Sequence, residues 1–134
     1  MQYLLDTSVF SQPLRLKCVE GALQRWKAIG DKNCLVSSTT IAEVEFGLWI
    51  EDREQRWAKY RFLLENRLQI LQTTEEVWHS FAKMKARQRA LGQPIEDLDL
   101  LIAATASANG LTIATLNSTD FSRIEGISWE DWSI

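Results

Sequence analysis

The chain has 134 residues, a length at which a single compact domain buries most of its apolar surface, so we expect one domain over residues 1–134. The hydrophobic fraction of 46% and the charged fraction of 25% exclude a disordered or low-complexity chain. The net charge of −3 gives no support to a nucleic-acid partner, although acids gathered around a bound divalent cation would remove that objection.

Cysteine spacing and hydropathy exclude further classes. Cys18 and Cys34 lack Cys-x-x-Cys spacing, which argues against a zinc site or a disulfide framework and is typical of reduced, mostly buried thiols. The first residues contain no basic leader, and no stretch approaches the roughly 18 apolar residues of a membrane span. We therefore expect a cytoplasmic protein that does not associate with membranes.

Short apolar runs alternate with segments of helical periodicity along the chain. Strands are predicted at Gln2–Leu5, Cys34–Ser37, Leu68–Leu71, Leu111–Thr115 and Ile127–Trp129. Helices are predicted at Pro13–Ile29, Thr40–Ile50, Glu54–Asn66, Thr74–Leu91 and Asp97–Asn109. This alternation predicts an α/β fold with a mostly parallel central sheet flanked by helices.

Four acids fall where such a fold brings segments together. Asp6 follows the first strand, Glu43 lies early in the helix after the second, and Asp120 lies in the loop after Leu111–Thr115. Asp99 opens a helix that runs antiparallel to the strand it precedes, so its start lies at the same edge. Ligands of open α/β sheets bind at the carboxyl ends of the strands. We therefore expect these acids to converge at that edge.

Each acid also has a purely structural interpretation. Thr40 and Glu43 match a capping box, with Thr40 as the N-cap. Asp97 is a suitable N-cap, and Asp99 would suit the positive end of the helix dipole. Turn formation would account for Asp6 and Asp120. These readings do not explain why all four acids converge.

A shared metal does explain the convergence. Two carboxylates about 4 Å apart repel by roughly 4 kcal/mol at an effective dielectric near 20. Hard cations such as Mg²⁺ or Mn²⁺ prefer oxygen ligands and remove this repulsion. Such sites suit the hydrolysis of phosphodiester bonds. The acids therefore predict a metal-dependent nuclease.

The ordered motifs resemble those of PIN-domain ribonucleases, specifically VapC-type toxins of VapBC toxin–antitoxin pairs. They span almost the whole chain. The matching segments are Tyr3–Ser8, Ser37–Gly47, Gly92–Ile95 leading into Asp99–Ala104, Thr115–Phe121, and the tail containing Trp129 and Trp132.

The resemblance implies a site residue by residue. The first acid of the family matches Asp6, the helical glutamate matches Glu43, and the third acid matches Asp99. For the fourth position we favour Asp120 for its charge, with Asn117 as a ligand or an orienting amide. Further candidates are Thr7, for a metal-linked water or the phosphate, and Asp97, for the helix cap or the surroundings of the ligands.

The implied activity is Mg²⁺- or Mn²⁺-dependent cleavage of RNA, with tRNA or another structured RNA as the candidate substrate. The implied partners are a cognate antitoxin and a second copy of the chain in a homodimer. Trp49 and Trp57 are candidates for a partner groove. The basic stretch of Lys83, Lys85, Arg87 and Arg89 is either a solvated helix face or a surface for RNA phosphates. Further candidates for phosphate contacts, without any motif, are Arg15, Lys17, Arg53, Arg56 and Arg61.

Three alternatives remain open from the residues. One is a PIN-like binding or regulatory module without turnover, and another is a DNA-directed nuclease with the same site. The third, a phosphatase or receiver domain that uses Asp6 as phospho-acceptor, is disfavoured because Ser8 stands where phosphatases need a second aspartate.

Overall fold

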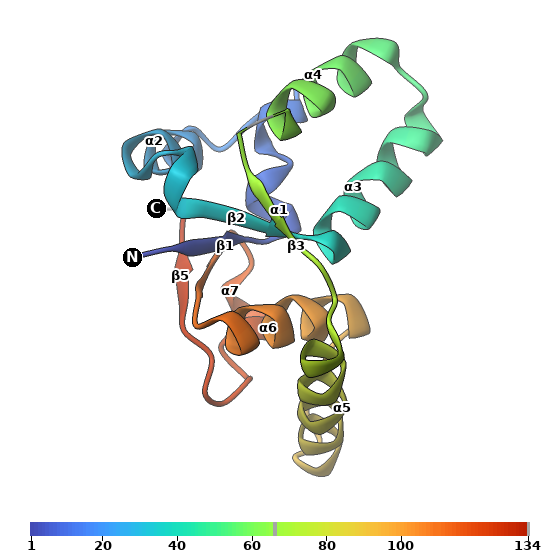
Figure 1. Ribbon diagram of the computed structural model, residues 1–134, viewed down its shortest axis with the longest axis vertical. Helices are drawn as coiled ribbons and strands as arrows, with labels where there is room; N and C mark the ends of the chain where they lie inside the picture. The colour runs from blue at the N-terminus through green and yellow to red at the C-terminus, as the bar shows by residue number, and fades with distance from the viewer. Residues whose placement is uncertain (66, 134) are drawn as a thin grey trace.

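A five-stranded sheet forms the centre of the computed structural model, which describes residues 1–65 and 67–133 (Figure 1). Its strands are β1 (Tyr3–Leu5), β2 (Cys34–Ser37), β3 (Gln69–Leu71), β4 (Thr112–Thr115) and β5 (Trp129–Asp131). Their order is β3-β2-β1-β4-β5, and all neighbouring pairs are parallel. This arrangement confirms the predicted α/β fold with a parallel sheet.

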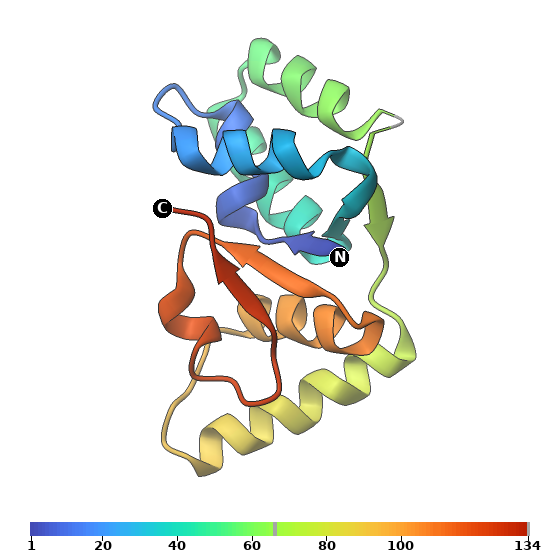
Figure 2. The same cartoon turned by 90° about the vertical axis from the view of Figure 1, so that its left-hand side faces the viewer.

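Helices cover both faces of the sheet (Figures 1 and 2). Those of the first half are α1 (Thr7–Phe10), α2 (Glu20–Ile29), α3 (Ser38–Glu51) and α4 (Glu54–Leu64), with 3₁₀ turns η1 (Gln12–Leu14) and η2 (Asp31–Asn33). Those of the second half are α5 (Glu75–Ala90), α6 (Asp97–Asn109) and α7 (Ser118–Phe121). Helices α1 to α4 lie on one face, and α5 and α6 lie on the other. No helix in the described part of the chain is long and apolar enough to cross a bilayer.

The alternation of side chains along the central strand divides the core in two. Tyr3 and Leu5 of β1 pack against the α1–α4 layer, whereas Leu4 packs against α6. Both leucines are completely buried, and each contributes roughly 1.5–3 kcal/mol of burial free energy. The central strand is therefore apolar throughout, as expected for a strand covered on both sides.

The connections place the site at one edge of this sheet. The chain leaves β1 through α1 and α2 on one face, and it enters β4 from α6 on the other face. The carboxyl ends of β1 and β4 therefore flank the point where the direction of winding reverses. This position is where parallel α/β sheets bind their ligands.

The predicted helix Pro13–Ile29 is wrong in its first half. Helix α2 begins only at Glu20, after η1 and a non-helical segment. The buried side chain of Gln12 accounts for this difference, because its Oε1 accepts from Val19 N at 2.8 Å and its Nε2 donates to Ser8 O at 2.9 Å. Leu16, which lies in this non-helical segment, is 88% exposed.

The other predicted elements are present, with small differences at their ends. Helix α3 begins at Ser38 rather than Thr40, and the C-terminal strand lies at Trp129–Asp131, two residues later than predicted. Helix α4 ends at Leu64, and the predicted end at Asn66 lies outside the described residues. The short helices α1 and α7 follow strand ends directly and are too short to produce a periodic pattern.

Candidate metal and catalytic site

Asp6 is buried at the carboxyl end of β1 and caps the N-terminus of α1. Its Oδ1 accepts hydrogen bonds from Ser8 Oγ at 2.6 Å and from Val9 N at 3.0 Å. Its Oδ2 accepts from the Thr115 hydroxyl at 2.5 Å. Both oxygens are thus oriented by donors from β4 and from the first turn of α1.

Burial sets the protonation of this carboxyl group. It raises the pKa of Asp6 above the ordinary value, while the hydrogen bonds from Ser8, Thr115 and Val9 act in the opposite direction. A nearly inaccessible carboxylate is costly to ionise, and the three donors offset only part of that cost. A bound cation would stabilise its charged form.

Glu43 lies on the second turn of α3 and faces α1 rather than the helix end. Its Oε1 accepts from the Thr7 hydroxyl at 2.6 Å, across 36 residues of sequence. The capping-box prediction is wrong, because Ser37 is the N-cap of α3 and its Oγ accepts from Thr40 N at 3.1 Å. The carboxylate of Glu43 is therefore not needed by the helix backbone.

Asp99, in the first turn of α6, lies within electrostatic range of the other three acids. Partial burial and, after it, the negative charges of Asp120, Glu43 and Asp6 together raise its pKa to about 6. The effect of Asp120 is the largest of these charge effects. The fold thus brings together the four acids selected from the sequence.

The two remaining polar candidates differ in their surroundings. Asn117 is exposed at the N-cap position of α7, where its side chain makes no cap hydrogen bond and its backbone N donates to Thr115 Oγ1 at 2.8 Å. Asp97 is not the N-cap of α6, because Glu96 occupies that position. Instead, Asp97 is exposed and pairs with Lys85 of α5 at 2.9 Å. This ion pair gives Asp97 a basic partner of its own.

The donor set suits a hard divalent cation. All four candidate ligands are carboxylates, and their mutual repulsion is visible in the raised pKa of Asp99. Within residues 1–65 and 67–133, no three of these groups lie close enough together to form a ready-made metal cage. The residues therefore fit a magnesium-type ion in their chemistry.

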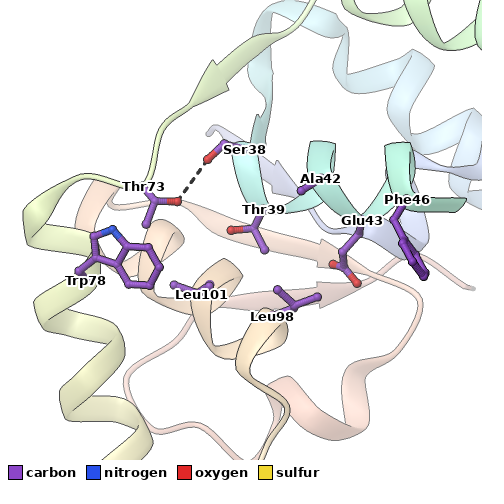
Figure 3. Close-up of a pocket in the computed structure, with 9 residues that line it drawn as sticks. All are labelled: Ser38, Thr39, Ala42, Glu43, Phe46, Thr73, Trp78, Leu98 and Leu101. Carbon is purple, nitrogen blue, oxygen red and sulfur yellow. Dashed lines mark hydrogen bonds between the residues drawn. The ribbon is translucent and has the colours of Figure 1, made fainter. Parts of the chain in front are cut away.

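Two clefts meet at Glu43. A polar cleft of about 240 Å³ runs between α1, η1 and α3, and its lining includes Thr7, Glu43, Arg15 and Arg56. An apolar cleft of about 510 Å³ lies on the other side, between α3, α5 and α6 (Figure 3). Phe46 and Trp78 stand at its two ends, and the bond between Ser38 and Thr73 closes one wall.

Sequence reasoning did not single out the residues that hold Asp6 in place. Ser8 and Thr115 both donate to its carboxylate, and Ser8 Oγ also accepts from Leu116 N at 2.9 Å. The strand register would have indicated Thr115, because Leu5 is paired with Ala114 and the next residues of the two strands therefore lie side by side. A hydroxyl at the end of a strand adjacent to an aspartate is the signal.

The comparisons with known proteins agree on one family. A model of the PIN domain matches residues 3–127. The plasmid stability protein StbB of Pseudomonas syringae pv. tomato is 32% identical and covers 88% of this chain and 89% of its own length. The tRNA(fMet)-specific endonuclease VapC of Shigella flexneri is 26% identical and covers 99% of both chains.

Solved structures with a similar fold include proteins of the same type. VapBC2 from Rickettsia felis, solved bound to a DNA fragment from its promoter, superposes with a TM-score of 0.88 at 26% identity and covers 98% of this chain and 99% of its own. The match of the family model spans the strands and helices that carry all four acids. The chain is therefore a member of the PIN-domain family, of the VapC type.

Proposed function

We propose that this protein is the ribonuclease toxin of a toxin–antitoxin pair, and that it hydrolyses RNA phosphodiester bonds with Mg²⁺ or Mn²⁺. The observation that carries the proposal is the convergence of Asp6, Glu43, Asp99 and Asp120 at the carboxyl edge of the sheet. Relatives of nearly the same length are named as VapC ribonucleases, which supports the same activity here.

The acids take different roles in this proposal. Asp6 and Asp99 would hold the principal ion, because Asp6 is fixed by three donors and the pKa of Asp99 is raised to about 6 by burial and by the neighbouring acids. Glu43 and Asp120 complete the site by orienting the attacking water or by helping to hold a second ion. When bound, such an ion would supply charge stabilisation at the phosphate and activation of water.

Thr7 has a supporting role in the same site. Its hydroxyl donates to Glu43, so one oxygen of that carboxylate is fixed while the other remains available to a water molecule or to the ion. Asn117 is proposed as an orienting amide next to Asp120, because its exposed side chain has no role in capping α7. Asp97 is assigned no ligand role, because Lys85 neutralises it.

The substrate is proposed to be a tRNA or another structured RNA. The support is the Shigella flexneri relative, which is named as a tRNA(fMet)-specific endonuclease and covers 99% of this chain at 26% identity. A carboxylate–metal site does not itself distinguish ribose from deoxyribose, so the preference must come from contacts with the 2′-hydroxyl elsewhere on the surface. Parallel cleavage assays with single-stranded DNA, tRNA and unstructured RNA test whether the protein prefers structured RNA.

We assign the antitoxin and the second copy of the homodimer to two different surfaces. The rings of Trp49 in α3 and Trp57 in α4 pack edge to face, with their centroids 5.0 Å apart, and Trp49 is 67% exposed. We assign this pair to the binding of the antitoxin. The apolar cleft carries the exposed side chains of Phe46, Trp78 and Leu98, and we assign it to a second copy of the chain (Figure 3).

The decisive experiment compares Asp6→Asn and Asp99→Asn with Asp97→Asn. All three change one carboxylate to an amide, but only Asp97 lies in an exposed ion pair with a lysine. We expect Mg²⁺-dependent RNA cleavage and Mn²⁺ binding to be lost in the first two variants and retained in the third. Cleavage that survives in both Asp6→Asn and Asp99→Asn, or that proceeds equally in EDTA, would overturn the proposal.

A further inference from the structure

The polar cleft beside the acids contains positive charge that the site itself does not use. Arg15 and Arg56 both line this cleft together with Thr7 and Glu43. Arg56 forms an ion pair with Glu51, so its charge is balanced within the protein. Arg15 has no carboxylate partner among residues 1–65 and 67–133, and its Nε donates to Ser11 Oγ at 3.3 Å.

The backbone holds Arg15 at this place. It follows η1, and its N donates to Gln12 O at 3.1 Å. Gln12 in turn is buried and bonded to Ser8 O and Val19 N, so the start of this segment is tied to α1, which carries Thr7. The exposed guanidinium thus extends from a fixed base into a cleft that ends at Glu43.

The chemistry of the cleft favours an anionic strand. An exposed arginine without a partner can bind a phosphate through two parallel hydrogen bonds. The described residues that line this cleft of about 240 Å³ include no aromatic side chain on which a base could stack, so the cleft suits a phosphodiester backbone better than a stack of bases. A basic protein segment would instead be repelled by Arg15, and its charge would have to be balanced by Glu43 and Glu51.

We propose that the polar cleft is the path of the RNA backbone to the acidic site, and that Arg15 binds a phosphate next to the one that is cleaved. This inference rests on the proposed ribonuclease function and adds the direction from which the substrate strand enters. Thr7 and Glu43, at the junction of the cleft with the acids, mark the point where the strand reaches the cleaved bond.

The test measures binding and cleavage of a short fluorescein-labelled single-stranded RNA by the full chain. The variants are Arg15→Ala, Arg15→Lys and, as a control, Lys32→Ala. Lys32 is also exposed and basic, but it lies in η2, at the amino edge of the sheet and opposite the acids. Fluorescence anisotropy in Ca²⁺ reports RNA binding without turnover, and cleavage in Mg²⁺ reports KM and kcat.

We expect Arg15→Ala to raise the Kd and the KM for RNA on the order of tenfold, the effect of losing one charge-assisted hydrogen-bonded contact. The slope of log Kd against log salt should flatten by about 0.7, the value for one phosphate contact with a single strand. Arg15→Lys should restore the salt slope but not the full affinity. Kcat and Mn²⁺ affinity should stay unchanged in all these variants, as should RNA binding in Lys32→Ala.

The outcomes separate this inference from the proposed function. RNA cleavage by the wild-type protein with an unchanged Kd and salt slope in Arg15→Ala would overturn the inference and leave the function intact. Absence of cleavage by the wild-type protein would overturn the function, while the anisotropy measurement would still decide whether Arg15 binds RNA. Unchanged RNA binding with weakened binding of the antitoxin would assign the cleft to a protein and would also overturn the inference.

Discussion

The hydroxyl of Thr115 donates to Oδ2 of Asp6 at 2.5 Å and so joins two residues that lie 109 positions apart in the sequence. The bond connects the carboxyl ends of β4 and β1, where both residues are buried. The same hydroxyl oxygen accepts from Asn117 N at 2.8 Å. Thr115 therefore fixes the carboxylate of Asp6 and the beginning of the loop that leads to Asp120.

The first prediction concerns this bond. Thr115→Val keeps the shape of the side chain but removes the donor, so we expect the pKa of Asp6 to rise further and stability to fall by about 1–3 kcal/mol. Mn²⁺ affinity should fall more at pH 6 than at pH 8, because the protonated carboxyl group cannot bind the ion. Isothermal titration at the two pH values and urea unfolding measure these effects.

Thr112→Val is the matched control. Thr112 begins the same strand, but within the described residues the hydrogen bond of its hydroxyl goes to Met1 Sδ at 3.9 Å and not to a carboxylate. We expect its Mn²⁺ affinity to match that of the wild-type protein at both pH values. Equal losses in both variants would show that the threonines act through the strand and not through the carboxylate of Asp6.

The second prediction concerns the pH dependence of stability without metal. The pKa of Asp99 is raised from an ordinary 3.8 to about 6 by burial and by the neighbouring acids, so the folded protein binds its proton more tightly than the unfolded chain. The contribution of Asp99 to stability is therefore greatest below about pH 4. It decreases as the pH rises to about 6, by at most about 3 kcal/mol and less after solvent screening.

Asp99→Asn should remove this penalty. In EDTA at pH 7.5 we expect the variant to unfold at higher urea concentration than the wild-type protein, although it should no longer cleave RNA. At pH 4 the two proteins should unfold together, and Asp97→Asn should follow the wild-type protein at both values. A wild-type stability that rises between pH 4 and pH 6 relative to Asp99→Asn would contradict the assigned direction.

The central sheet and most helices could be predicted because their patterns are local. Four buried residues at Cys34–Ser37, or the apolar run of α6 closed by Gly110 in a left-handed conformation, are readable without knowledge of the fold. The interruption before α2 could not be predicted, because it depends on the buried side chain of Gln12 and its bonds to Ser8 and Val19. Periodicity carries no information about such a contact.

The candidate site could likewise be predicted only in part. The edge of the sheet at which the acids meet follows from chain order and from parallel pairing. The role of Glu43 did not follow, because Thr40 and Glu43 match a capping box locally, while the true N-cap, Ser37, lies three residues earlier. A contact between Thr7 and Glu43 needs the packing of α1 against α3, which no local pattern encodes.

The third prediction addresses the fourth acidic position. Asp120 has the largest charge effect on the pKa of Asp99, whereas the side chain of Asn117 is uncharged and exposed. We expect Asp120→Asn to lower the pKa of Asp99 and to weaken Mn²⁺ binding more than Asn117→Ala does. Carboxyl-carbon NMR titration of the metal-free protein measures the pKa. A larger loss of Mn²⁺ affinity in Asn117→Ala would make the asparagine the fourth ligand.

The last prediction concerns Gln88, a polar side chain of α5 that is only 1% exposed. Its Nε2 donates to Gln93 O at 3.1 Å and to Arg123 O at 3.2 Å. The first carbonyl lies in the segment that leads to α6 and Asp99, and the second follows α7, which carries Asp120. One buried amide thus connects the supports of two of the acids.

Gln88→Met keeps the volume but leaves both carbonyls without this donor, which should cost about 1–3 kcal/mol of stability. We also expect weaker Mn²⁺ binding at 25 °C under conditions where the variant is fully folded, because the two acids lose their common support. Gln24→Met, an exposed position on α2, should change neither quantity. If Gln88→Met lowers only the unfolding temperature and leaves Mn²⁺ affinity at the wild-type value, Gln88 stabilises the fold without positioning the acids.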